Sequence, residues 1–258
     1  MIERLTQLFK YRALIQILIQ RELKARYRGT ILGFLWSFVN PLVLMVIYVL
    51  VFSIYMRIDM QNYPVFILCS TLPWTWFSSG LNEATNSIII NGGLVKKIYL
   101  PSEIFPFVYI GSNMIHYLLT IPILFLFLIL FQVKVSWLLL FFPLIVCIQF
   151  IFAYSLSLIL SSLAVQFRDL LHVVPNLLMI WFFLTPVFYP IAMVPGKYLP
   201  LVDFNPMARL IMAYQDIFFY NRLPSIPSLS IMAGLSSLLL LIALSFFEAR
   251  KDLFAEEV

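Results

Sequence analysis

Glu83 is the main acidic residue inside the long apolar stretches of this sequence. In carriers driven by protons or sodium ions, buried acids lie near the middle of the membrane. Glu83 lies toward the end of its apolar stretch, where a carboxylate can stay hydrated. We therefore expect Glu83 to be a structural or gate residue. The alternative is a proton carrier, which wild-type transport by a Glu83→Gln variant at all pH values would exclude.

Near the N-terminus, Arg21, Lys24, Arg26 and Arg28 form a basic cluster with the chemistry to bind anions. Guanidinium and ammonium groups bind phosphate oxygens through charge-assisted hydrogen bonds. The same four charges are also suited to anionic lipid head groups. A third interpretation is that they only mark the cytoplasmic side of a membrane protein. All three interpretations stay open at this point.

Other sets of reactive residues are missing from the sequence. His116 and His172 are too few for a histidine-rich metal site, and no Ser-His-Asp or Cys-His arrangement is readable. Cys69 and Cys147 lie singly within apolar stretches, where cysteine is usually a small packing residue. No GxxxxGK[ST] loop is present to bind ATP. We expect no catalytic residue, no metal and no cofactor in this chain, so energy for any process in which it takes part must come from another subunit.

The elements that position these residues are predicted from the distribution of charge. Of the residues, 62% are apolar and 11% are charged, against about 25% charged in ordinary soluble domains. Long uncharged stretches recur that can cover the roughly 20 residues a helix needs to cross a bilayer. The chain is predicted to be an all-α membrane protein with one transmembrane domain over residues 1–258. Its six transmembrane helices are expected at about 31–56, 63–90, 104–131, 137–165, 172–189 and 226–247.

Lysine and arginine predict the orientation of these spans, because they favour the cytoplasmic side. They concentrate before the first span, in the connection at 91–103, at Arg168 and in the C-terminal tail. All of these segments share one side of a six-span topology. Both termini are therefore expected in the cytoplasm, with the protein in the cytoplasmic (inner) membrane. This placement accounts for the net charge of +5, so no nucleic-acid partner is needed.

Two segments are expected to lie at the membrane surfaces. Residues 1–29 carry apolar side chains on one helical face and polar ones on another, which predicts an amphipathic interface helix. Packing of that helix on another protein helix is a compatible alternative. Residues 190–225 contain five prolines and scattered charges, yet the run 207–219 is apolar at helical spacing. This outer segment is predicted to form re-entrant helices between the fifth and sixth spans.

The connection at 91–103 suits the attachment of a cytoplasmic motor. Its Gly92-Gly93 pair is expected to break the preceding helix, and 94–100 to form a short amphipathic turn before Pro101. The candidate residues for coupling to an ATPase are Leu94, Val95, Lys96, Lys97, Ile98 and Tyr99.

Four stretches of the chain resemble one protein family. They are RELKARYRGTILGFLWSFVNPL (21–42), KKIYLPSEIFPF (96–107), FRDLLHVVPNLLMIWFFLTPVFYP (167–190) and NPMARLIMAYQDIFF (205–219). In this order, they resemble the permease subunits of ABC transporters that export O-antigen, capsule or teichoic acid. The resemblance covers essentially the whole chain and is closest to the O-antigen type.

The resemblance implies a function that the residues alone do not establish. The chain would be a transporter permease, not an enzyme, and two copies would form a homodimeric pore. Two copies of a separate cytoplasmic ABC ATPase, carrying ATP and magnesium, would power it. The substrate would be a lipid-linked polysaccharide moved outward, with its pyrophosphate near the basic cluster. The segments 11–28, 93–100 and 190–222 would be the interface helix, the coupling helix and the outer helices that help to close the exit.

A polysaccharide needs a wet or polar-aromatic path, because its hydroxyl groups cannot cross hydrocarbon unsolvated. Aromatic rings suit such a path because the C–H face of a sugar stacks on the negative face of a ring. The alternative is that Trp and Tyr mark the membrane interfaces and that Phe contacts lipid. The candidate pore-lining rings are Trp36, Tyr48, Phe52 and Tyr55 on the first span, Trp74, Trp76 and Phe77 on the second, and Trp181, Phe182, Phe183, Phe188 and Tyr189 on the fifth.

Three other functions stay open. A small-molecule or drug exporter permease of the same superfamily would need a closed apolar cavity. A membrane scaffold without transport activity would need neither an aromatic path nor a re-entrant segment. A secondary carrier is disfavoured because buried acids are scarce.

Overall fold

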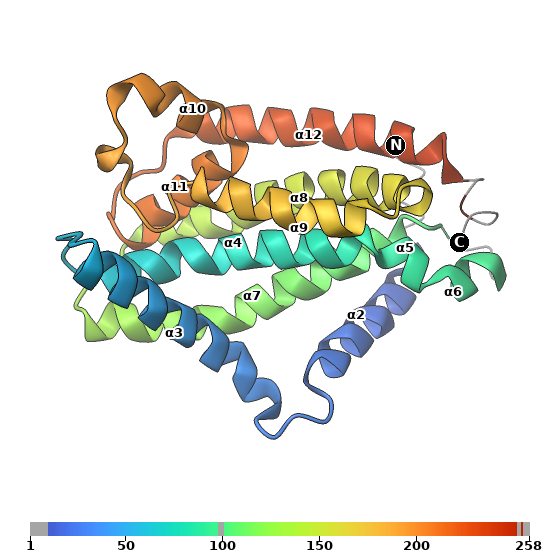
Figure 1. The fold of residues 1–258 in the computed structure, drawn as a ribbon, viewed down its shortest axis with the longest axis horizontal. Coiled ribbons are helices and arrows are strands. Elements are labelled where there is room, and N and C mark those ends of the chain that lie inside the picture. The colour runs from blue at the N-terminus through green and yellow to red at the C-terminus, as the bar shows by residue number, and fades with distance from the viewer. Residues whose placement is uncertain (1–9, 98–100, 252–253, 255–258) are drawn as a thin grey trace.

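The computed structural model describes residues 10–97, 101–251 and 254. All regular secondary structure within these ranges is helical and forms an elongated bundle (Figure 1). The prediction of an all-α protein is therefore confirmed. In the part of the chain that the structure describes, four helical segments are long and apolar enough to cross a membrane: Gly33–Tyr55, Ile104–Leu130, Trp137–Gln166 and Ile226–Glu248.

Helix α4 (Tyr63–Thr85) lies at the centre of the bundle. It contacts α3 (Trp36–Tyr48), α7 (Ile104–Leu130), α8 (Phe142–Gln166) and α9 (Leu170–Phe183). Its 23 residues are enough for a span, but it is more polar than the four segments above because it carries hydroxyl and amide side chains. Most of its residues are buried, so neighbouring helices shield these polar groups.

The first predicted span is a bent helical segment in three parts. Gly33–Leu35 is a 3-10 turn, α3 follows, and Val49–Tyr55 continues as a π-helix. Pro41 lies inside α3, where proline removes a backbone hydrogen bond and favours bending. At its N-terminal end α3 leans away from the bundle, so that α2 (Arg12–Tyr27) and α3 form a V in Figure 1.

The end of the second predicted span differs from the prediction. The helix of the second span ends at Thr85 and continues after Asn86 as the short α5 (Ser87–Ile90). The prediction that Gly92-Gly93 breaks this helix is wrong in position, because Gly92 already begins α6 (Gly92–Lys97).

The fifth helix, α9, ends at Phe183, short of the predicted residue 189. Pro186 explains this end, because the residue before a proline is pushed out of the helical region. Thr185 helps to close the last turn by donating its hydroxyl proton to the carbonyl of Trp181 at 2.8 Å. At 14 residues, α9 is a short apolar helix rather than a full-length span.

The outer segment folds back into the bundle through four short helices. They are Ile191–Met193, Gly196–Tyr198, α10 (Leu199–Phe204) and α11 (Pro206–Phe218). The predicted apolar helix at 207–219 is therefore confirmed as α11, and most of its residues are buried against α4, α8 and α12.

Helix α12 (Ile226–Glu248) packs along α8. Small buried residues occur on both helices, including Ser157 and Ser161 on α8 and Ser236 and Ala243 on α12, and small side chains let apolar helices approach closely. The beginning of α2, the end of α12, and α5 and α6 all lie at the same end of the bundle in Figure 1, opposite α10 and α11.

Candidate functional site

Glu83 is the centre of a polar network that joins α2 to α4 and α7. The Nη2 atom of Arg26 donates to both carboxylate oxygens of Glu83, at 2.7 and 2.8 Å. Asn113 on α7 donates its Nδ2 hydrogen to Glu83 Oε2 at 2.6 Å and accepts from Arg26 at 3.1 Å. The side chains of Arg26 and Glu83 are 24% and 37% exposed, so the pair is partly shielded from solvent.

The apolar face of α2 holds this network in place. Ile15 and Leu18 are buried against Ile104 and Val108 of α7. The predicted amphipathic helix is therefore present, and its apolar face packs on a protein helix.

Tyr27, at the end of α2, forms a second polar junction. Its hydroxyl group lies 3.1 Å from Nδ1 of His116 on α7 and accepts from the Ser37 hydroxyl at 2.6 Å. Ser37 belongs to the first turn of α3. Tyr27 therefore links the ends of α2 and α3 to the middle of α7.

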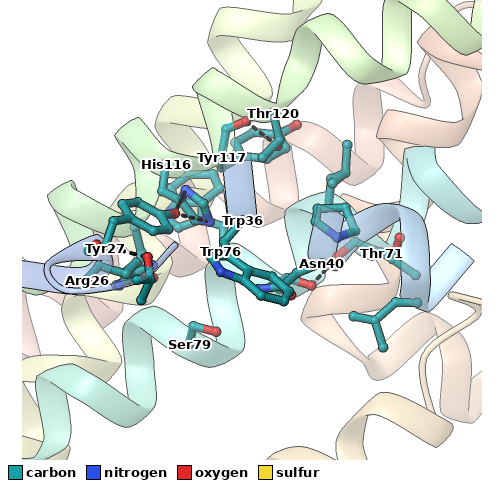
Figure 2. Close-up of a pocket in the computed structure, with 16 residues that line it drawn as sticks. Arg26, Tyr27, Trp36, Asn40, Thr71, Trp76, Ser79, His116, Tyr117 and Thr120 are labelled. Carbon is teal, nitrogen blue, oxygen red and sulfur yellow. Dashed lines mark hydrogen bonds between the residues drawn. The ribbon is translucent and has the colours of Figure 1, made fainter. Parts of the chain in front are cut away.

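A cavity of about 400 Å³, here called the Tyr27 cavity, opens beside these two junctions (Figure 2). It lies between the end of α2, α3, α4 and α7, and it combines aromatic rings with hydroxyl, amide and imidazole groups. Its polar and aromatic lining residues are Arg26, Tyr27, Thr30, Trp36, Asn40, Thr71, Thr75, Trp76, Ser79, Asn113, His116, Tyr117 and Thr120.

A smaller cavity of about 270 Å³, the Tyr48 cavity, lies between α3, α4 and α9. It shares Leu44, Thr71 and Thr75 with the Tyr27 cavity. It is also lined by Ser78 and Asn82, whose buried Oδ1 atom has no hydrogen-bond partner. One polar face of α4 therefore borders two neighbouring cavities.

The predicted aromatic residues are distributed over several environments. Trp36 and Trp76 line the Tyr27 cavity, and Tyr48, Trp74 and Phe182 line the Tyr48 cavity. A third cavity of about 550 Å³, the Tyr198 cavity, lies under the outer helices and is bordered by Trp181, Phe183 and Tyr189. Phe52 and Phe188 stack on each other at 4.3 Å between ring centroids.

Burial separates rings that look alike in the sequence. Phe77 is fully buried and packs against Phe152 and Trp181. Tyr55 is 81% exposed and Phe183 is 51% exposed. Only the exposed rings can contact another molecule without rearrangement of this chain.

The basic cluster is divided between two environments. Arg26 is paired with Glu83, whereas Arg21 is exposed and donates to Glu22 and Asn91. Lys24 and Arg28 are also exposed. The positive charge of Arg26 is therefore neutralised by Glu83, whereas those of Lys24 and Arg28 face solvent.

Of the coupling candidates, Leu94 lies in α6, and the backbones of Val95, Lys96 and Lys97 complete that helix. Ile98 and Tyr99 lie outside the described residues.

Sequence reasoning missed most polar residues of the Tyr27 cavity. Thr71, Thr75 and Ser79 are four residues apart on α4, which places them on one helical face. Asn113, His116 and Thr120 recur at similar spacing on α7. Polar residues at helical spacing within apolar stretches were a readable signal, because polar groups in spans rarely face lipid.

Comparison with known proteins identifies the family. Residues 13–219 match the description ABC-2 type transporter. The chain belongs to the ABC-2 type transporter family. This ABC-2 family chain is 39% identical over 260 residues to the O-antigen export system permease protein RfbA of Myxococcus xanthus, covering 100% of both chains.

Two further relatives of this ABC-2 chain match along most of their length. The O-antigen export system permease protein RfbA of Klebsiella pneumoniae is 34% identical over 245 residues, covering 94% of each chain. The polysialic acid transport protein KpsM of Escherichia coli is 23% identical over 248 residues, covering 92% of this chain and 93% of the relative. The predicted resemblance to polysaccharide-export ABC permeases is thereby confirmed.

Proposed function

We propose that this chain is the permease subunit of an exporter that moves a lipid-linked, O-antigen-like polysaccharide from the cytoplasmic side outward. The observation that carries the proposal is the full-length similarity to an O-antigen export system permease at 39% identity. A relative named for polysialic acid transport matches nearly as much of the chain, which supports a polysaccharide as the substrate class.

The proposed topology has six spans, with both termini in the cytoplasm of an inner membrane. It adds α4 and α9 to the four long apolar segments. The position of α2 and of the end of α12 at one end of the bundle supports it. The segment from Ile191 to Phe218 then lies at the opposite, outer end, as a re-entrant element of the same single domain.

Pore formation in this proposal requires two copies of the chain. Apolar residues of α3 and α9 are exposed in the single chain, among them Val43, Ile47, Leu177 and Met179. Contiguous exposed apolar surface needs lipid or protein to cover it. In a homodimer, a second copy of the chain on the other side of the pore would cover part of this surface. ATP and magnesium bind to two copies of a separate ATPase subunit, which docks beside α6, so the permease itself needs no cofactor.

The cavities support a glycan rather than an apolar drug. The Tyr27 and Tyr48 cavities border hydroxyl and amide groups together with aromatic rings. An apolar ligand would leave those polar groups without partners, at a cost of about 1–3 kcal/mol for each buried one.

Deletion of the gene in its own host tests the proposal. We expect polysaccharide to disappear from the surface of intact cells and to accumulate inside, where an antibody or lectin reaches it only after permeabilisation. Re-expression of the wild-type chain should restore the surface signal, and re-expression without the partner ATPase should not. An unchanged surface signal in the deletion strain, combined with new sensitivity to small toxic compounds, would reject the proposal in favour of a drug exporter.

A further inference from the structure

We propose that the Tyr27 cavity binds an uncharged, hexose-sized sugar unit of the transported polysaccharide. This inference rests on the proposed function and adds to it a location and a chemical class of ligand. The volume of about 400 Å³ lies within the roughly 300–1,000 Å³ of small-molecule sites. Figure 2 shows aromatic and polar side chains from several helices converging on this space.

The Tyr27 cavity has no unneutralised charged side chain among its described lining residues, which favours an uncharged ligand. Among the described residues that line it, Arg26 is the only Lys, Arg, Asp or Glu. The Arg26 guanidinium already donates to both carboxylate oxygens of Glu83. The Glu83 carboxylate neutralises that charge and would repel a phosphate or carboxylate ligand at close range. Sugar hydroxyl groups bring no net charge and leave the ion pair intact.

Helix α4 presents hydrogen-bond acceptors to the cavity. The Thr75 hydroxyl donates its proton to the carbonyl of Thr71 at 2.8 Å, which leaves the oxygen lone pairs of Thr75 to accept from a ligand. Ser79 lies one turn further along the same face. Asn40 on α3 adds an amide that both donates and accepts. A polyol matches this mixture because each of its hydroxyl groups also donates and accepts.

Aromatic surface completes the match to a sugar. Trp36 lines the cavity and is 36% exposed, so its ring can receive the C–H face of a sugar. Trp76 and Tyr117 stack on each other at 5.3 Å between centroids and form a buried wall. A sugar held between Trp36 and α4 would direct its hydroxyl groups toward Thr75 and Ser79.

The test measures equilibrium binding of polysaccharide released from the surface of the host cells to the permease–ATPase complex in nanodiscs. The Thr75→Val/Ser79→Ala double variant removes two hydroxyl groups with little change in shape. We expect binding to weaken about fivefold for each hydroxyl removed. Ser237→Ala is the matched control, because the Ser237 hydroxyl is exposed on α12 and bonds only the carbonyl of Ala233 in its own helix; it should bind as the wild type does.

Two additional measurements keep the test decisive. Trp36→Leu should weaken binding and Trp36→Phe should retain it, and because Trp36 is exposed both variants should keep the wild-type melting temperature. Wild-type binding should stay constant when salt rises from about 0.05 M to about 0.5 M, since a neutral ligand is not screened. Wild-type affinity in the double variant, or a steep loss of binding with salt, would overturn the proposed site.

The same cells separate failure of the site from failure of the proposed function. Surface polysaccharide that disappears on gene deletion but is exported normally by the double variant would reject the sugar site alone. Surface polysaccharide that survives gene deletion would reject the export function, and the sugar site with it.

Discussion

Arg26 and Glu83 lie 57 positions apart in the sequence and form an ion pair with N–O distances of 2.7 and 2.8 Å. The pair fastens the amphipathic helix α2 to the central helix α4. Asn113 holds the same carboxylate from α7. Three helices therefore meet at the carboxylate of Glu83. This geometry agrees with the structural role that we expected for Glu83 from the sequence.

Replacing Arg26 by Ala should release the end of α2. The loss leaves the Glu83 carboxylate partly buried without its cation, and we expect a cost of about 1–3 kcal/mol, between the values for exposed and buried pairs. Hydrogen exchange should increase along Arg12–Tyr27, and polysaccharide export should fall. Arg28→Ala is the control, because Arg28 is exposed. Equal exchange rates in both variants would show that the ion pair does not hold α2.

Gly80 should tolerate only a small side chain. A Cβ atom added there would lie 3.2 Å from Ile110 Cδ1 and 3.5 Å from Asn113 Cβ. Ile110 is fully buried, so Gly80→Val must push α4 and α7 apart, at about 1–3 kcal/mol for overpacking. The melting temperature of the purified complex should fall with Val and much less with Ala.

Gly234→Ala on α12 is the matched control for this series, since nothing lies within 4 Å of its added Cβ. It should melt at or above the wild-type temperature, because alanine favours a helix over glycine. A Gly80→Val complex as stable as the wild type would contradict the close approach of α4 and α7.

Asn205 should be indispensable for the outer segment. Its Oδ1 atom accepts from Trp181 Nε1 at 2.7 Å and caps α11 at the backbone nitrogens of Met207 and Ala208. Its Nδ2 atom donates to the Leu184 carbonyl and the Thr185 hydroxyl. Asn205→Ala removes a cap and leaves buried groups unpaired, and we expect a loss of about 2–4 kcal/mol.

The rate of limited proteolysis between α9 and α12 measures this loss of stability, and Asn205→Ala should be cleaved faster than the wild type. Asn205→Asp should give an intermediate result, because it keeps the acceptor and loses both donated bonds. Asn176→Ala serves as the control, since Asn176 is exposed and bonds only the His172 carbonyl of its own helix. The role assigned to Asn205 fails if its Ala variant is cleaved no faster than the Asn176 variant.

The aromatic residues should divide into two functional groups. Phe77→Ala should destabilise the chain by about 3–5 kcal/mol, because it empties space in the core. Tyr55→Ala and Phe183→Ala should leave the melting temperature unchanged and lower export, if exposed rings line the path. Melting temperature, polysaccharide export and ATPase binding are measured for each variant. A core ring lowers the melting temperature, whereas a path ring lowers export and leaves ATPase binding unchanged. Normal export by both Tyr55→Ala and Phe183→Ala would show that these two rings do not line the transport path.

Helix positions were predictable from the sequence because the bilayer demands long uncharged runs. The ends of α7 and α12 fall within one residue of the predicted limits. The end of α9 could also have been predicted, because the residue before Pro186 is disfavoured in a helix. The placement of Gly92 at the start of α6 was not, since glycine disfavours a helix interior by only about 1 kcal/mol and Gly92 is the first residue of this helix.

The candidate site was less predictable because it depends on contacts between distant segments. Phe77 and Phe183 carry the same side chain in similar apolar stretches, and only packing makes one buried and the other exposed. The basic cluster gave no indication that Arg26 would pair with an acid on another helix, whereas Arg21 pairs with its sequence neighbour Glu22. The hydroxyl face of α4 could have been found, because Thr71, Thr75 and Ser79 follow helical spacing within an apolar run.

The junction at Glu83 also imposes an order on synthesis. Arg26 leaves the ribosome 57 residues ahead of Glu83 and 87 residues ahead of Asn113. At about 5–20 residues per second, the full junction cannot close until several seconds after α2 has emerged. Until Glu83 has been synthesised, the charge of Arg26 is not neutralised by its partner on α4. In the proposed topology, this positive charge favours retention of the N-terminal segment on the cytoplasmic side until α2 packs into the finished bundle.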